Sequence, residues 1–339
     1  MKHHPPRVRI AGVASYLPPA RRSSAEVEEM VTACSPNVPV PSGLVQAMTG
    51  VRWRHVADEG VNASDLAAAA GRSVLERTRM APGDVDLLIF ASASQDMLEP
   101  ATANMVQEKV GTSCPVFDIK NACNSFLCGI QAAEALILTG QANAALITCG
   151  EIPSRSIKWA VQGKRDFKSS FPGYTLGDAG AAALLVRSDD NRGIFHRSFQ
   201  TMSQYWHLAT IAGGGSAHPR GDEHSYFQSD GTAMRDAFAE MGAHPIERAL
   251  EQSGTSFDDY RCILVHQVAM PYLRNFLAAT GVPEDKVQLT LPELGNIASA
   301  TLPAGFVEAE RAGRIAPGDN VLWIGLASGI SAGVIAMRY

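Results

Sequence analysis

The chain has 339 residues, a formal net charge of −5 at pH 7, and a composition that is 46% hydrophobic and 19% charged. These values predict a globular protein with a sizeable core, and the lack of a basic patch argues against nucleic-acid or anionic-membrane binding. No segment approaches the roughly 18 consecutive apolar residues of a membrane span, and the N-terminal segment lacks the apolar core of a signal peptide. We therefore expect a cytoplasmic protein.

Six cysteines, at positions 34, 114, 123, 128, 149 and 262, are scattered along the chain without CxxC pairs. Several lie inside apolar runs of strand length, and none has the spacing of a zinc site or of a disulfide framework. We expect reduced thiols, with no metal site and no bound cofactor.

Taken in chain order, the predicted helices and strands occur twice, at an offset of about 175 positions. The first copy consists of a strand at 87–90, a helix at 102–111, a strand at 116–119, a helix at 126–139, and strands at 145–148 and 182–187. The second copy consists of a strand at 262–265, a helix at 273–281, a strand at 287–290, a helix at 302–312, and strands at 321–324 and 333–338. Two halves, 1–188 and 189–339, are predicted.

The strands of both halves are apolar throughout, which is typical of sheets that helices cover on both faces. We therefore predict a duplicated α/β fold whose halves pack about a pseudo-twofold axis. Because ligands bind beyond the carboxyl ends of strands in open α/β sheets, the loops of both halves are expected to meet at one cleft. Two stretches between the halves, 162–174 and 212–227, are predicted to be irregular.

Cys123 lies between a predicted strand and a predicted helix. A thiol at a helix start faces unpaired amides and the positive end of the helix dipole, which would lower its pKa and favour a nucleophilic thiolate. A buried structural cysteine is the alternative interpretation of the same residue. Cys128, one turn later within an apolar stretch, fits that structural role better.

Three further positions follow predicted strands of the second half. His266 ends the apolar run 262–265, Asn296 lies on a loop after the strand at 287–290, and the segment 325–329 follows the strand at 321–324. Catalysis would explain a histidine, an amide and free backbone amides at one cleft. A satisfied strand-end histidine and ordinary turn residues explain them as well.

The run 117–129 around Cys123 resembles the nucleophile segment of bacterial β-ketoacyl-acyl carrier protein synthase III, a family of the thiolase superfamily. His266-Gln267, Gly295-Asn296 with Ser299-Ala300, and the closing 325–333 stretch resemble the same family. The motifs at 49–52, 176–182 and 213–216 extend the resemblance over nearly the whole chain. It implies a five-layered αβαβα architecture and a homodimer.

The resemblance also implies roles for individual residues. Cys123 would take an acyl group from a coenzyme A or acyl-carrier-protein (phosphopantetheine) thioester, which is a substrate and not a bound cofactor. His266 and Asn296 would hold the carbonyl of a second thioester and stabilise its enolate. The amides of Cys123 and Ser328 would form the oxyanion hole for acyl transfer.

Some positions depart from the pattern of the priming synthases. Val268-Ala269 stands where they have Ala-Asn, Ala327-Ser328-Gly329 where they have three glycines, and no early tryptophan is present in 23–32. Glu99, in Leu98-Glu99-Pro100, replaces a phenylalanine that enters the partner's acyl pocket. A glutamate here resembles the olefin- and pyrone-forming branch that joins two acyl chains, and implies a base acting across the dimer. An isolated surface glutamate is the alternative.

The sequence therefore predicts an acyltransferase of the synthase III type that joins a Cys123-bound acyl group by Claisen condensation to a second acyl or malonyl thioester. Lipid or natural-product biosynthesis is the expected setting. One alternative is a tailoring acyltransferase that delivers the acyl group to an alcohol or amine, with His266 as general base. Another is a non-catalytic partner subunit of a heterodimeric ketosynthase, which the intact Cys123, His266 and Asn296 argue against.

Overall fold

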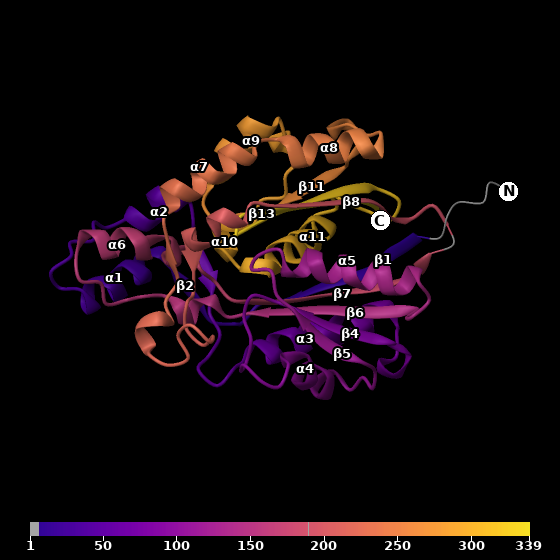
Figure 1. Cartoon of the computed structure of the whole chain (residues 1–339), viewed down its shortest axis with the longest axis horizontal. Coiled ribbons are helices and arrows are strands. Elements are labelled where there is room, and N and C mark those ends of the chain that lie inside the picture. The colour runs from indigo at the N-terminus through magenta and orange to yellow at the C-terminus, as the bar shows by residue number, and fades with distance from the viewer. Residues whose placement is uncertain (1–6, 189) are drawn as a thin grey trace.

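A computed structural model describes residues 7–188 and 190–339, which form two sheets separated and covered by helices (Figure 1). The first sheet has five strands in the order β1-β7-β6-β4-β5. Their bounds are Arg7–Tyr16 for β1, Ala179–Ser188 for β7, Ala144–Glu151 for β6, Leu87–Ala91 for β4 and Val116–Ile119 for β5. The strands β4, β5 and β6 run parallel, so their carboxyl ends lie at one edge.

The second sheet repeats this arrangement with four strands in the order β11-β12-β13-β8. Their bounds are Cys262–Val265 for β11, Asn320–Ala327 for β12, Ser331–Arg338 for β13 and Gly193–Thr201 for β8. The edge strand β11 runs parallel to β12, and the other neighbouring strands are antiparallel. The duplication predicted from the sequence is confirmed, and it extends to β1 and β8, which the sequence comparison did not include.

The helices form three layers around the two sheets, which gives the predicted αβαβα arrangement (Figure 1). The central layer holds α5 (Ser125–Leu138) and α11 (Thr301–Arg311), whose apolar side chains share one large core with both sheets. The outer face of the first sheet packs on α3 (Ala63–Thr78) and α4 (Thr102–Val110). The outer face of the second sheet packs on α8 (His244–Ser253) and α9 (Met270–Thr280).

Two details of the sequence prediction are wrong. The segment 287–290 is not a strand, because only Val287 forms a bridge, with Ile263 of β11, before α10 (Leu291–Leu294) begins. The stretch 162–174 is not irregular, since it contains α6 (Lys164–Ser170) and a 3₁₀ helix at Phe171–Thr175. The other stretch, 212–227, has only one 3₁₀ turn at Asp222–His224 and is otherwise irregular.

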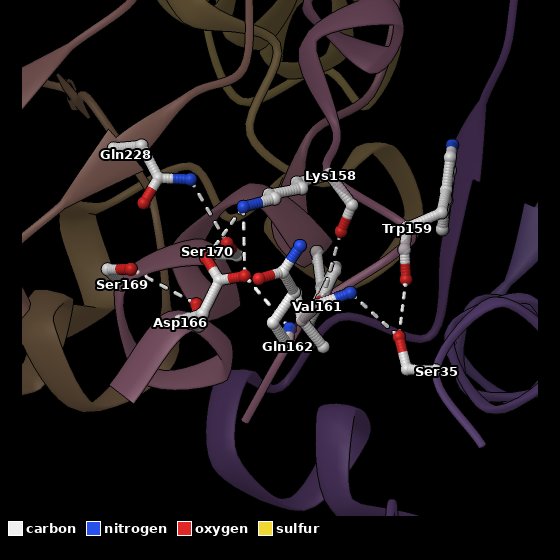
Figure 2. Close-up of polar contacts among 10 residues, drawn as sticks. Ser35, Lys158, Trp159, Val161, Gln162, Asp166, Ser169, Ser170 and Gln228 are labelled. Carbon is white, nitrogen blue, oxygen red and sulfur yellow. Dashed lines mark hydrogen bonds and ion pairs between the residues drawn. The ribbon is translucent and has the colours of Figure 1, made fainter. Parts of the chain in front are cut away.

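A smaller apolar cluster beside the sheets packs α1 (Ser24–Cys34) and α2 (Leu44–Thr49) against the segment 157–176. Figure 2 shows the polar contacts that hold this segment: Lys158 pairs with Asp166 of α6 at 2.8 Å, and the Ser35 hydroxyl bridges the backbone of Trp159 and Val161.

One further long helix, α7 (Gly231–Met241), packs near the β12–β13 hairpin. The remaining elements are short. The two-stranded pairs are β2 (Arg21–Ser23) with β3 (Trp53–His55), and β9 (Ala209–Thr210) with β10 (Gln228–Ser229). Within the described ranges, no helix has the length and apolarity needed to cross a bilayer.

Candidate active site

Cys123 lies on a tight turn between β5 and α5. The preceding residue, Ala122, has a φ of 47°, a left-handed conformation that non-glycine residues adopt only when their surroundings enforce it. Ser125 enforces it here, since its hydroxyl donates to the Ala122 carbonyl at 2.7 Å and accepts from the Asn121 amide at 2.8 Å. Because α5 begins at Ser125, the thiol precedes the helix by two residues.

Asn124 joins this turn to the second half of the molecule. Its side-chain amide donates to the carbonyl and the hydroxyl of Ser331, at 3.2 and 2.9 Å, at the start of β13. Gly325 of β12 allows the close approach, because a Cβ at that position would lie 2.1 Å from the Asn124 Oδ1. The nucleophile turn therefore lies against the β12–β13 hairpin.

The expected low pKa of Cys123 is wrong. Burial raises the pKa of the thiol to about 12, and the nearby charge of Glu151 adds to the rise. A hydrogen bond from a backbone amide opposes the shift but is weaker than these two effects. At neutral pH Cys123 therefore carries a thiol, and a nucleophilic role requires a group that accepts its proton.

His266 follows β11 directly and is buried. Its backbone amide donates to the Ile324 carbonyl at 2.9 Å, one residue before Gly325, so the histidine and the Cys123 turn adjoin the same stretch of β12. Neither ring nitrogen has a hydrogen-bond partner within the described part of the chain. Burial lowers the pKa of His266 to about 4, so the imidazole is neutral at pH 7 and can either donate or accept one proton.

Asn296 is buried on the loop between α10 and α11. Its backbone bonds to the loop before β7 in both directions, donating to Thr175 at 2.8 Å and accepting from Gly177 at 3.0 Å. Its side-chain oxygen accepts from the amide of Ala298 at 3.1 Å. This leaves the Nδ2 group free to donate to a ligand, as enolate stabilisation requires.

Ser328 lies in the three-residue turn between β12 and β13. Its amide has no hydrogen-bond partner among the residues that the structure describes. The Asn124–Ser331 bonds attach the Cys123 turn to the first residue after this hairpin turn. The contacts thus bring Cys123, His266 and Ser328 to segments that adjoin the β12–β13 hairpin, whereas the contacts of Asn296 are to the segment before β7.

Glu99 does not lie with these residues, because it is exposed on the surface of the single chain. It follows Met97 and Leu98, which are 48% and 70% exposed, on the loop between β4 and α4. The loop ends at the start of α4, which is attached to the sheet. Asp118 of β5 accepts hydrogen bonds from the first two amides of that helix, both at 2.8 Å. Glu99 therefore lies near the open edge of the first sheet and not beside the Cys123 of its own chain.

Glu151 is a site residue that the sequence analysis missed. It ends β6, is fully buried, and lies close enough to Cys123 to raise the pKa of that thiol. The sequence contained an indication of this role. Glu151 is a polar residue at the carboxyl end of an apolar strand, and the same pattern singled out His266. Its partners, far away in sequence, were not predictable from that pattern.

Comparisons with known proteins support this arrangement. The family model for 3-oxoacyl-[acyl-carrier-protein (ACP)] synthase III matches residues 117–203, and the model for the C-terminal part of that synthase matches residues 250–339. The β-ketoacyl-[acyl-carrier-protein] synthase III of Methylococcus capsulatus is 30% identical over 332 residues, which cover 98% of both chains. The chain belongs to the β-ketoacyl-[acyl-carrier-protein] synthase III family.

Another member of the synthase III family, from Neisseria gonorrhoeae, is 29% identical over 333 residues, or 98% of this chain and 99% of the relative. Crystal structures of Xanthomonas campestris OleA share the fold, with TM-scores of 0.88 and 0.89 at 24% identity. The first of these covers 98% of this chain and 99% of OleA, and contains lauric acid and lauroyl-CoA. The predicted family and thiolase-like fold are confirmed, and the chain is a condensing enzyme of the synthase III type.

Proposed function

We propose that this enzyme forms an acyl thioester on Cys123 and joins it by Claisen condensation to a second acyl or malonyl thioester of coenzyme A or acyl carrier protein. In the first step the Cys123 sulfur attacks the donor thioester, its proton leaves, and the donor thiol departs. In the second step the α-carbon of the other thioester loses a proton, or carbon dioxide when the substrate is a malonyl thioester, and the resulting enolate carbon bonds to the acyl carbon. The bond to Cys123 breaks and the thiol is restored.

The observation that carries the proposal is the neutral, unpaired His266 beside the segment that holds the Cys123 turn. A neutral imidazole can accept the Cys123 proton in the first step, which the raised pKa of the thiol makes necessary. In the second step the same ring, now a donor, and the free Nδ2 of Asn296 can stabilise an enolate. The amides of Cys123 and Ser328 are proposed to bind the oxygen of the acyl group during both transfers.

We propose Glu99 as the base that removes a proton from the second thioester when that substrate carries no carboxyl group to lose. Its exposure and its two exposed apolar neighbours support a position inside the partner of a homodimer. Among the described residues the strand β5 pairs only with β4, which leaves its other edge free near this loop. A second copy that pairs along β5 would cover the loop.

The experiment is intact-mass analysis of the enzyme with acyl thioesters of several chain lengths, followed by addition of a malonyl or a simple acyl thioester. We expect one added acyl group, then its loss together with a β-keto product. Transfer of the acyl group to an added alcohol or amine, with no such product, would establish the tailoring acyltransferase instead. Wild-type enzyme that uses only the malonyl substrate would remove the need for Glu99 as a base.

A further inference from the structure

Glu151 forms an unusually complete set of hydrogen bonds for a buried carboxylate. One oxygen accepts from the amide of Ala93 at 2.8 Å and from the amide and hydroxyl of Ser299, the amide at 3.4 Å. The other accepts from the amide and hydroxyl of Ser94, at 3.0 and 2.9 Å. All five donors are neutral, so hydrogen bonds alone hold the carboxylate in place.

These donors belong to two loops of different halves. Ala93 and Ser94 begin the loop after β4, which leads to Glu99. Ser299 lies three residues after Asn296, in the turn that precedes α11. One carboxylate at the end of β6 thus holds a loop of its own half and a loop of the other half.

The two loops have few other attachments to each other. The Ser94 hydroxyl also accepts from the amide of Ile152 at 3.0 Å, and the Ser299 hydroxyl is 3.3 Å from the carbonyl of Ala91 on β4. Both of these additional bonds lead to the strands next to Glu151, β6 and β4. Each loop also has anchors of its own, such as the Ser92 hydroxyl on the Gly150 carbonyl at 2.9 Å and the Asn296 backbone on Thr175 and Gly177, so the contribution of Glu151 is to link one loop to the other.

We propose that Glu151 is a positioning residue for the condensation, which fixes the Asn296 loop and the Glu99 loop relative to Cys123 through one buried carboxylate. This inference rests on the proposed function, because it assigns the residue to the second half-reaction. The charge is expected to have a separate effect on the nucleophile. Glu151 is the one charged group that shifts the pKa of Cys123, and it also raises that of the buried Cys149.

Two substitutions separate the effect of the side-chain length of Glu151 from the effect of its charge. Glu151→Gln keeps the length but places an NH₂ group against donors and removes the charge. Glu151→Asp keeps the charge but is one methylene too short to reach all five donors. Because a misplacement of about 1 Å can cost about 10²-fold in rate, we expect both variants to condense about 10- to 100-fold more slowly. Acylation of Cys123 should change much less in both.

Alkylation of Cys123 by iodoacetamide, followed by peptide mass spectrometry against pH, provides a readout that a purely structural role would not move. Glu151→Gln should alkylate Cys123 about three- to tenfold faster than wild type at each pH below 9, because the neighbouring charge is gone. Glu151→Asp should follow the wild-type profile. Ser299→Ala, a milder change that loses one hydroxyl donor, should slow condensation without altering the alkylation profile.

Condensation at the wild-type rate in folded Glu151→Gln and Ser299→Ala would overturn the inference. An equal loss in both half-reactions, with an unchanged alkylation profile, would also overturn it, because that result describes a general packing role. If wild-type enzyme acylates but never condenses, the proposed function fails instead. The alkylation profiles of the two Glu151 variants then still decide whether the carboxylate acts on Cys123.

Discussion

The two halves of the molecule have the same strand order but place different chemistry at equivalent strand ends. In the first half, β4 leads to Glu99, β5 to Cys123, and β6 ends at Glu151. All three are ionisable groups. Glu151 lies in a dense set of hydrogen bonds, and Cys123 follows the strained turn residue Ala122. In the proposed mechanism, the first half therefore supplies the nucleophile and the carboxylates of the site.

The second half supplies neutral groups whose polar atoms are left unpaired. β11 leads to His266, the segment after Val287 leads to Asn296, and β12 leads to Ser328. Both ring nitrogens of His266 and the amide of Ser328 lack partners in the part of the chain that the structure describes. Burying unpaired polar groups costs free energy, and in the proposed mechanism a bound substrate pairs with the buried ring of His266. The equivalent strand ends of the two halves therefore carry different chemical groups.

The largest expected effect is the loss of acylation in Cys123→Ala, which removes the nucleophile of the first half. The mass of the enzyme should rise by one acyl group in wild type and not at all in this variant. Cys128→Ala is the matched control and should still be acylated, because its thiol serves a structural role and accepts from Asn121. Acylation that survives in Cys123→Ala would mean that the nucleophile has been assigned to the wrong residue.

Substitution of the second half's donors should affect the later step more. His266→Ala and Asn296→Ala should lower the condensation rate by about 10²–10³, the usual cost of losing one oxyanion donor. Asn296→Ala should acylate nearly normally, whereas His266→Ala should also acylate more slowly if the imidazole accepts the Cys123 proton. Single-turnover rates of the two steps provide the test. Normal condensation in both variants would refute the division of roles.

A smaller effect is expected where the two halves touch. In Gly325→Ala the new Cβ would approach Asn124, so the Cys123 turn must move. We expect acylation about tenfold slower and a loss of about 1–3 kcal/mol in the free energy of unfolding, as for other overpacked sites. Gly83→Ala is the control, because a Cβ there meets nothing within 4 Å. Equal behaviour of the two variants would show that the contact does not hold the turn.

A different effect, not on the reaction, concerns the pH dependence of stability. The unfolded chain protonates His266 at its ordinary pKa of 6.5, whereas the folded chain does so only near 4. The unfolded state therefore binds more protons between these values, and the native state should lose roughly 3 kcal/mol as the pH falls from 6.5 to 4. Denaturant unfolding of His266→Gln should lack this loss, while the exposed His207→Gln should retain it. A wild-type profile in His266→Gln would contradict the burial of a neutral imidazole.

The sequence pattern predicted the duplication and the positions of Cys123 and His266 after strands, because apolar strings followed by polar residues mark strand ends. The resemblance to the family implied the five layers. The sequence pattern did not predict the sign of the pKa shift at Cys123. Local sequence indicates a helix start, but the shift depends on burial and on Glu151, which tertiary packing brings close. The strand expected at 287–290 also depended on packing, because an apolar run forms a strand only where a neighbour offers a full edge.

The most direct test of the account is a single turnover with isotope-labelled acyl enzyme and an unlabelled simple acyl thioester, with the product identified by mass spectrometry. The account predicts a β-keto product in which the labelled acyl carbon is bonded to the α-carbon of the second substrate. It also predicts that Glu99→Gln acylates normally but forms this product about 10²-fold more slowly. Label recovered only as free acid, ester or amide, in wild type and variant alike, would contradict the condensation.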